Sequence, residues 1–95
     1  MSAYIVFIRE RTLDASEMQA YARMAPAALN GHPVEVLALY GPHEVIEGGP
    51  LEGVAVLKFP DLAAARAWYD SPAYRAAREH RARGAEYRAV IVEGA

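Results

Sequence analysis

The chain has 95 residues, of which 54% are hydrophobic, and its formal net charge is −2. This length fits a single domain spanning residues 1–95, and the slightly acidic charge excludes the strong basic field of a nucleic-acid-binding surface. The absence of cysteine excludes disulfide bonds, thiolate catalysis and thiolate metal sites.

The first predicted elements are a strand and a helix. Ala3–Ile8 is apolar on both alternating faces, which predicts a buried strand. Asp14 and Glu17 have capping-box spacing and predict the start of a helix that ends before Gly31. Pro26 inside this helix removes a backbone donor, so we expect a kink or a restart there. The apolar stripe of the helix consists of Met18, Tyr21, Ala22, Ala25 and Leu29.

The apolar run of the first strand also bears on cellular location. Tyr4–Ile8 has five residues and is followed at once by Arg9, Glu10 and Arg11. A membrane span needs about 20 apolar residues, and a signal-peptide core also needs more than five. We therefore expect a soluble cytoplasmic protein without a membrane partner. Nine arginines against a single lysine suggest a GC-rich bacterial genome.

Three further strands are expected at Val34–Tyr40, Val54–Phe59 and Tyr87–Val92, and His43–Glu47 could add a short extended segment. Between the last two strands the sequence predicts two consecutive helices. Pro60-Asp61 begins the first, and Ser71 with Pro72 at the first helical position begins the second. The inner side of the first of these helices is expected to hold Leu62, Ala65, Trp68 and Tyr69, and the second helix is expected to end at Gly84.

The predicted order is β-α-β-β-α-β, the ferredoxin-like arrangement of the α+β class, with a four-stranded antiparallel sheet and a split second helix. The strands are apolar on both faces; in the first, Ile5 and Phe7 oppose Val6 and Ile8. An antiparallel sheet with one face in water would alternate apolar and polar residues instead. Because the helices can cover only one face, we expect the other to pack against a second copy, giving a homodimer.

The stretch WYDSPAYRAAREHR, residues 68–81, contains the best candidates for a ligand site. Tyr74, Arg78 and Arg81 share one face of the predicted helix, and Trp68 and Tyr69 end the helix before it. Aromatic rings beside guanidinium groups suit a small carboxylated or aromatic molecule. A plain solvated helix face is the alternative. The neighbouring face, expected to turn toward the sheet, consists of Ala73, Ala76, Ala77 and His80.

His80 is the one histidine on a predicted helix. It has no second histidine and no carboxylate three or four residues away, so the sequence predicts no metal site and no cofactor. We expect His80 to be a packed core or cavity residue; if it lines a cavity, it is the best general-base candidate in the chain. The tyrosines expected in the core or at an interface are Tyr4, Tyr21, Tyr40 and Tyr87.

Four segments together resemble a known family: AYIVF near the N-terminus, EVIEG in the middle, VLKFPDLAAARAWYDSPAYR, and the closing RAVIVEG. They are similar to domain-of-unknown-function family 1330, of the dimeric α/β-barrel superfamily. The pattern FP-x-L-x-x-A-x-x-W-Y-x-SP-x-Y is quite specific to it, and the resemblance covers essentially the whole chain. It implies a ferredoxin-like subunit that pairs with a second copy as a dimeric α/β barrel, and it implies no established activity.

The family pattern falls on Trp68, Tyr69, Ser71, Pro72, Tyr74 and Arg81. Two positions depart from it. His80 stands where many members have an apolar residue, which favours a packing role. Leu39-Tyr40-Gly41 stands where an Arg-Gly-Gly run is common, so a basic group that the resemblance places near the pocket is missing here.

Three functions are compatible with these observations. The expected one is a homodimeric protein that binds a small anionic or aromatic molecule in a cleft between helices and sheet. The second is a cofactor-independent enzyme of the monooxygenase, isomerase or decarboxylase type, by analogy of fold, with His80 as base and Arg81 as anion clamp. The third is a structural or regulatory interaction module. A pocket containing Trp68, His80 and Arg81 together would favour the first two.

Overall fold

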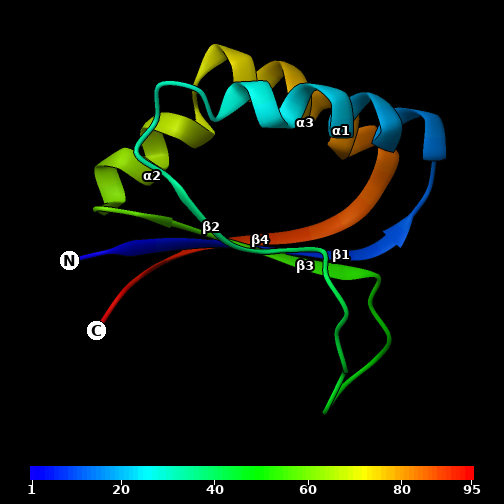
Figure 1. The fold of residues 1–95 in the computed structure, drawn as a ribbon. Helices are drawn as coiled ribbons and strands as arrows, with labels where there is room; N and C mark the ends of the chain where they lie inside the picture. Colours follow the sequence, from blue (N-terminus) through cyan, green and yellow to red (C-terminus); the bar gives the residue numbers. More distant parts are fainter.

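The computed structural model describes residues 1–95 and has four strands and three helices (Figure 1). In chain order they are β1 (Ala3–Thr12), α1 (Ala15–Ala28), β2 (Glu35–Leu39), β3 (Gly53–Phe59), α2 (Leu62–Tyr69), α3 (Pro72–Gly84) and β4 (Ala85–Glu93). The strands form one antiparallel sheet in the order β2-β3-β1-β4. This is the predicted ferredoxin-like α+β fold with a split second helix. None of the helices has the length and apolar character needed to cross a membrane.

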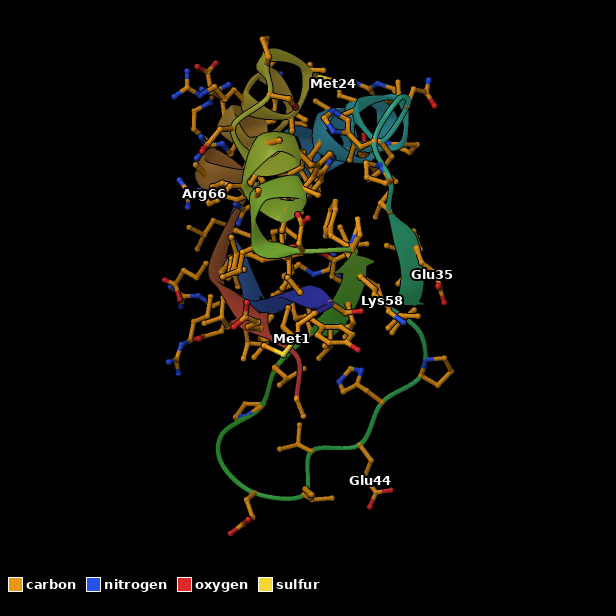
Figure 2. The ribbon with its side chains drawn as sticks, turned by 90° about the vertical axis from the view of Figure 1, so that its left-hand side faces the viewer. Met1, Met24, Glu35, Glu44, Lys58 and Arg66 are labelled. Carbon is orange, nitrogen blue, oxygen red and sulfur yellow. The ribbon has the colours of Figure 1, made fainter.

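All four predicted strands are present, and β1 and β4 extend beyond the predicted ranges to pair Thr12 with Ala85. The predicted extra extended segment is wrong, because His43–Glu47 forms no strand. The connection from β2 to β3 leaves the sheet on the side away from the helices, and Glu44 lies far from the body of the molecule (Figures 1 and 2). No neighbouring strand is within reach of this segment to pair with it.

The predicted side chains begin the three helices. Asp61 caps α2 and Ser71 caps α3. Asp14 Oδ1 caps α1 and accepts a hydrogen bond from the backbone N–H of Glu17 at 3.3 Å. The capping box is only half formed, because the carboxylate of Glu17 turns instead to His80 on α3. The start of α1 is thereby tied to α3.

The predicted restart at Pro26 is wrong, because α1 continues as one helix from Ala15 to Ala28. Proline in a helix costs one backbone hydrogen bond and crowds the carbonyl four residues before it. Pro26 stands in the last turn of α1, so the loss is confined to the end of the helix. The backbone N–H of Leu29 closes this end by donating to the carbonyl of Pro26 at 3.2 Å.

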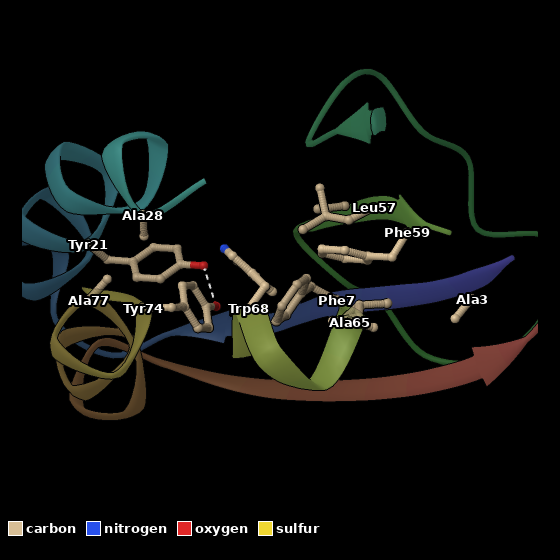
Figure 3. Close-up of a cluster of buried hydrophobic side chains, with 12 residues drawn as sticks. Ala3, Phe7, Tyr21, Ala28, Leu57, Phe59, Ala65, Trp68, Tyr74 and Ala77 are labelled. Atoms are coloured by element: carbon tan, nitrogen blue, oxygen red, sulfur yellow. Dashed lines mark hydrogen bonds between the residues drawn. The ribbon is translucent and has the colours of Figure 1, made fainter. Parts of the chain in front are cut away.

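The core lies between the helices and one face of the sheet (Figures 1 and 3). In β1, Ile5 and Phe7 are buried. Tyr4, Val6 and Ile8 alternate with them and are half-buried on the opposite face. Trp68 of α2 and Tyr74 of α3 fill the space above the sheet. Burying one such large side chain contributes about 1.5–3 kcal/mol relative to leaving it exposed. The sheet and the three helices are therefore held together by a few aromatic side chains.

The inner face of α3 differs from the predicted one. Ala73 and Ala76 are exposed, and the face that turns inward consists of Tyr74, Ala77, Arg81 and Gly84. The reason is packing: Tyr74 lies against Trp68, with ring centroids 4.0 Å apart. A large aromatic ring that fills the core outweighs the small surface that alanine can bury.

The face of the sheet that carries no helix is also largely apolar, as predicted. Val6 pairs with Val56 on one side and with Val90 on the other. Val90 is 55% exposed and Val92 is 52% exposed, although both are strong β-formers. We call this surface the open sheet face; it is made of Tyr4, Val6, Ile8, Val54, Val56, Val90 and Val92, together with the charged residues Lys58 and Arg88.

Candidate functional site

A cavity of about 270 Å³ lies between α1 and the inner face of the sheet. Phe7 of β1 and Leu57 of β3 line it from the sheet, and Met18 and Ala25 line it from α1. Thirteen of its 15 lining residues are hydrophobic. Its volume is slightly below the range of about 300–1,000 Å³ found for small-molecule sites, which are also mostly apolar with a few polar groups.

The cavity is bounded at one side by the end of α1 and by the edge strand β2. Pro26 and Leu29 line it from α1, and Val36 and Leu39 line it from β2. Leu39 is 65% exposed and Val36 is 44% exposed, so solvent reaches the cavity wall along this edge. Pro26, which is itself exposed, therefore stands at the cavity entrance.

Trp68 closes the cavity on the side of α2. Its side chain is fixed by aromatic neighbours, with Phe7 edge-on at 6.1 Å and Phe59 at 5.7 Å between ring centroids. The residue is only 2% exposed, and its indole nitrogen has no hydrogen-bond partner in the protein. Figure 3 shows this nitrogen on the side of the ring that faces Tyr21 and Ala28 of α1, away from Phe59. Buried N–H groups without a partner are rare.

Three tyrosines line the cavity, and their hydroxyl groups are engaged in two pairs. The hydroxyl oxygens of Tyr21 and Tyr74 are 2.7 Å apart (Figure 3). The hydroxyl of Tyr87 donates to that of Tyr40 at 3.0 Å. Burial raises the pKa of Tyr21, and burial and the bond with Tyr87 raise the pKa of Tyr40. Both hydroxyls therefore keep their protons at neutral pH.

Arg9 is the one charged residue among the residues that line the cavity. Its guanidinium lies 4.9 Å from the centre of the Tyr40 ring. Its Nε lies 3.3 Å from Oε1 of Glu52 in the connection between β2 and β3. The charge of Arg9 is therefore already paired with a carboxylate.

Arg81 is buried but lies behind the cavity wall. Only 8% of the residue is exposed, and its guanidinium carbon lies 5.3 Å from the centre of the Phe7 ring and 4.8 Å from that of Tyr87. It forms no ion pair with a carboxylate. Because a guanidinium stays protonated in proteins, this is a buried positive charge held by aromatic faces.

Tyr69 and Arg78 lie together, outside the cavity. The guanidinium of Arg78 is 4.3 Å from the centre of the Tyr69 ring and 3.8 Å from a carboxylate oxygen of Asp70. Tyr69 borders a separate, shallower hollow with Ile5 and Arg66. The two residues thus form an aromatic–arginine pair, but not on the cavity that Trp68 lines.

His80 is also outside the cavity. Its Nδ1 lies 2.6 Å from Oε2 of Glu17, and Arg83 contacts the same carboxylate at 3.4 Å. This cluster joins α3 to the start of α1. No group of three His, Asp or Glu side chains is arranged to hold a metal ion.

Of the site residues predicted from the sequence, Trp68 lines the cavity, and Tyr74 and Arg81 lie directly behind its wall. The structure adds Arg9 and Tyr40, to which the sequence pointed only weakly. Tyr40 is the middle residue of the run that departs from the family pattern, and this departure was the one feature of the sequence that could have pointed to it as a site residue. Tyr40 also has a left-handed backbone (φ 53°), which a non-glycine residue seldom adopts.

Comparisons with solved structures agree with the fold. RPA0582, a protein of unknown function from Rhodopseudomonas palustris, superposes with a TM-score of 0.73 at 20% identity, covering 99% of this chain and 82% of that one. A dimeric ferredoxin-like protein of unknown function from Thermobifida fusca gives a TM-score of 0.69 at 18% identity, with 97% and 90% covered. At such identities the likeness shows the fold alone.

A third solved structure is an enzyme. SnoaB from Streptomyces nogalater, described as a cofactor-independent oxygenase, gives a TM-score of 0.62 at 14% identity and covers 99% of this chain and 93% of that one. No curated protein sequence matches the chain. The model of a family described as a domain of unknown function, DUF1330, matches residues 2–95. The chain therefore belongs to the DUF1330 family.

Proposed function

We propose that this protein is a homodimer in which each subunit binds a small aromatic molecule in the cavity between α1 and the sheet. The observation that carries the proposal is the cavity itself, which is apolar, walled by Phe7, Trp68 and three tyrosine rings, and supplied with few polar groups. Flat apolar ligands gain most from such walls, because they replace water on both ring faces.

The geometry favours an aromatic ligand over a carboxylated one. A carboxylate needs an available cation, preferably a bidentate arginine. Arg78 is directed to Tyr69, Arg81 is separated from the cavity by the rings of Phe7 and Tyr87, and Arg9 is paired with Glu52. Only Arg9 lines the cavity, and the nearby carboxylate of Glu52 already offsets its charge.

The enzyme alternative lacks a base in the right place. A general base must be within hydrogen-bond reach of the proton that it removes. His80 is held by Glu17 away from the cavity, and no carboxylate or imidazole lines the cavity. The oxygenase activity of SnoaB belongs to a protein of the same fold at 14% identity, so we do not extend it to this chain.

Filling the cavity tests the proposal. Ala25→Phe should place a ring in the cavity from α1 without removing any polar group, and Ala27→Phe, at an exposed position of the same helix, is the matched control. We expect the wild type and A27F to bind acetophenone, seen as a saturable shift of the Trp68 indole signal in ¹H–¹⁵N NMR spectra. A25F should lose this binding. Equal binding by A25F and A27F would place the ligand elsewhere.

The homodimer rests on the open sheet face. Val90 and Val92 leave apolar side chains in water on a surface that a second copy would cover. The dimeric protein from Thermobifida fusca, of the same fold, supports this arrangement. The cavity lies on the opposite side of the sheet, so pairing through the open face would leave its entrance accessible.

A further inference from the structure

Two of the polar groups that line the cavity have a donor hydrogen without a partner in the protein. Trp68 presents an N–H that is buried and without a partner in the protein. Tyr40 accepts the hydrogen bond of Tyr87, so its own hydroxyl hydrogen is free to donate to another group. No carboxylate, amide or imidazole side chain lines the cavity. A ligand that complements these groups must therefore bring an acceptor.

The indole N–H is the donor that most needs an acceptor. A buried donor without a partner loses its hydrogen bond to water and gains none in return. Phe7, Phe59 and Tyr74 hold the indole ring by close packing, so it cannot easily turn the nitrogen toward solvent. The nitrogen is covered in the structure, so an oxygen that enters the cavity would satisfy it once a neighbouring side chain moves aside.

The acceptor is neutral rather than anionic, because desolvation outweighs the nearby positive charge. Arg81 lies behind Phe7 and Tyr87 and would favour an anion in the cavity. Tyr21 lines the cavity and Tyr74 lies behind its wall, so both hydroxyls are exposed to the same two effects. Burial raises the pKa of Tyr74 even though Arg81 acts to lower it, and the pKa of Tyr21 is raised as well. An anion within the cavity would meet the same penalty.

We propose that the cavity selects a neutral aromatic carbonyl compound, such as an aryl ketone, whose oxygen accepts a hydrogen bond from the indole N–H of Trp68. This inference rests on the proposed function, and it adds the polar contact and the charge state of the ligand. The aromatic ring lies among the apolar side chains from the sheet and α1, and the carbonyl points to Trp68.

Three small probes separate the parts of this inference: acetophenone, ethylbenzene and benzoate. They share a benzene ring and differ in carrying a ketone, no acceptor, or an anionic acceptor. Trp68 is the only tryptophan, so ¹H–¹⁵N spectra contain a single indole signal. We expect acetophenone to move the indole proton downfield, as a new hydrogen bond does, and ethylbenzene to bind without that downfield shift. Benzoate at pH 7 should bind at least about tenfold more weakly than acetophenone.

Substitution of the donor gives a second, independent measurement. Ethylbenzene is the more hydrophobic probe, so the informative quantity is the ratio of the two dissociation constants within one protein. We expect Trp68→Phe to reduce the preference for acetophenone over ethylbenzene about tenfold, the effect of one neutral hydrogen bond. Tyr4→Phe, which removes a hydroxyl on the open sheet face and keeps both the cavity and the indole, should leave the preference unchanged. If W68F does not fold, the indole shift in the wild type decides.

The outcomes are distinguishable. Binding of both neutral probes with an unshifted indole proton, or with the preference unchanged in W68F, overturns the hydrogen bond while the proposed function stands. Tighter binding of benzoate than of acetophenone overturns the neutral ligand. Loss of the preference in Y4F as well as in W68F would also overturn the hydrogen bond, because Tyr4 lies outside the cavity. If no probe binds in the cavity, the proposed function itself fails.

Discussion

At the scale of single residues, Arg81 is the side chain whose position needs the most explanation. The residue is only 8% exposed, and no carboxylate forms an ion pair with its guanidinium. Removing an ion from water costs several kcal/mol, and contacts with aromatic faces return about 2 kcal/mol at most. Phe7 and Tyr87 therefore compensate the charge only in part. A residue kept at such a cost is a candidate for a role beyond stability.

This imbalance predicts the effect of Arg81→Met, which keeps a long side chain and removes the charge. We expect its free energy of unfolding, measured in urea, to equal that of the wild type or to exceed it by up to about 2 kcal/mol. Arg78→Met, at the more exposed arginine beside Asp70, is the control and should change stability by less than about 1 kcal/mol. A loss of more than about 2 kcal/mol in R81M would mean that Arg81 is structural.

At the scale of the elements, the contact between α1 and α3 sets the distance between the helices above the sheet. Gly84, the last residue of α3, lies directly against Met18 of α1. A β-carbon at this position would be 2.7 Å from Sδ and 3.1 Å from the backbone nitrogen of Met18. The sulfur can move, but the backbone nitrogen is fixed within the first turn of α1. Met18 also lines the cavity, so this contact bears on the cavity's shape.

We therefore expect Gly84→Ala to be destabilising by about 1–2 kcal/mol, because overpacking outweighs the gain in helix propensity. Gly49→Ala is the matched control, since a β-carbon there would meet no atom within 4 Å. Its stability should stay within about 0.5 kcal/mol of the wild type. Thermal or urea unfolding of the two variants decides. Equal free energies of unfolding for G84A and G49A would show that α1 moves away from the new β-carbon without loss of stability, which would contradict the prediction.

The elements also show how far the sequence could be read. Asp14, Asp61 and Ser71 correctly predicted the starts of the three helices. Capping depends on hydrogen bonds between residues that are close in the sequence, so the sequence alone reveals it. The apolar residues on both faces of β1 predicted an apolar sheet face without helices, but not which of the two faces it is. The cavity could not be predicted, because it joins side chains from α1, α2 and all four strands. The prediction of which residues form the inner face of α3 was wrong. The spacing of residues within one helix does not reveal that Tyr74 packs against Trp68 of another helix.

The remaining differences from the sequence predictions concern residues whose partners lie far away in the sequence. His80 was expected in the core or a cavity, but its partner Glu17 lies 63 residues away in the sequence. Tyr40 was expected to be a core or interface aromatic residue, and its hydroxyl does bond to that of Tyr87. At the cavity its ring also lies beside the guanidinium of Arg9, which comes from β1. Such pairings follow from the fold and have no local signal.

At the scale of the whole molecule, the open sheet face predicts the assembly. Val90→Glu places a charge on that face, on the edge strand β4 and opposite Val6, and should prevent a second copy from packing there. Ala76→Glu, on the exposed side of α3, is the control. Light scattering after size exclusion should give twice the chain mass of 10.4 kDa for the wild type and A76E, and the single mass for V90E. A wild type of single mass would contradict the homodimer.

The central claim is that the cavity between α1 and the sheet is a ligand site, and a crystal structure of the wild type soaked with acetophenone tests it most directly. We predict density for the ring between Phe7 and Ala25, with the ketone oxygen within hydrogen-bond distance of Trp68 Nε1. Acetophenone bound only elsewhere on the protein, or a cavity closed by its own side chains, would contradict the claim.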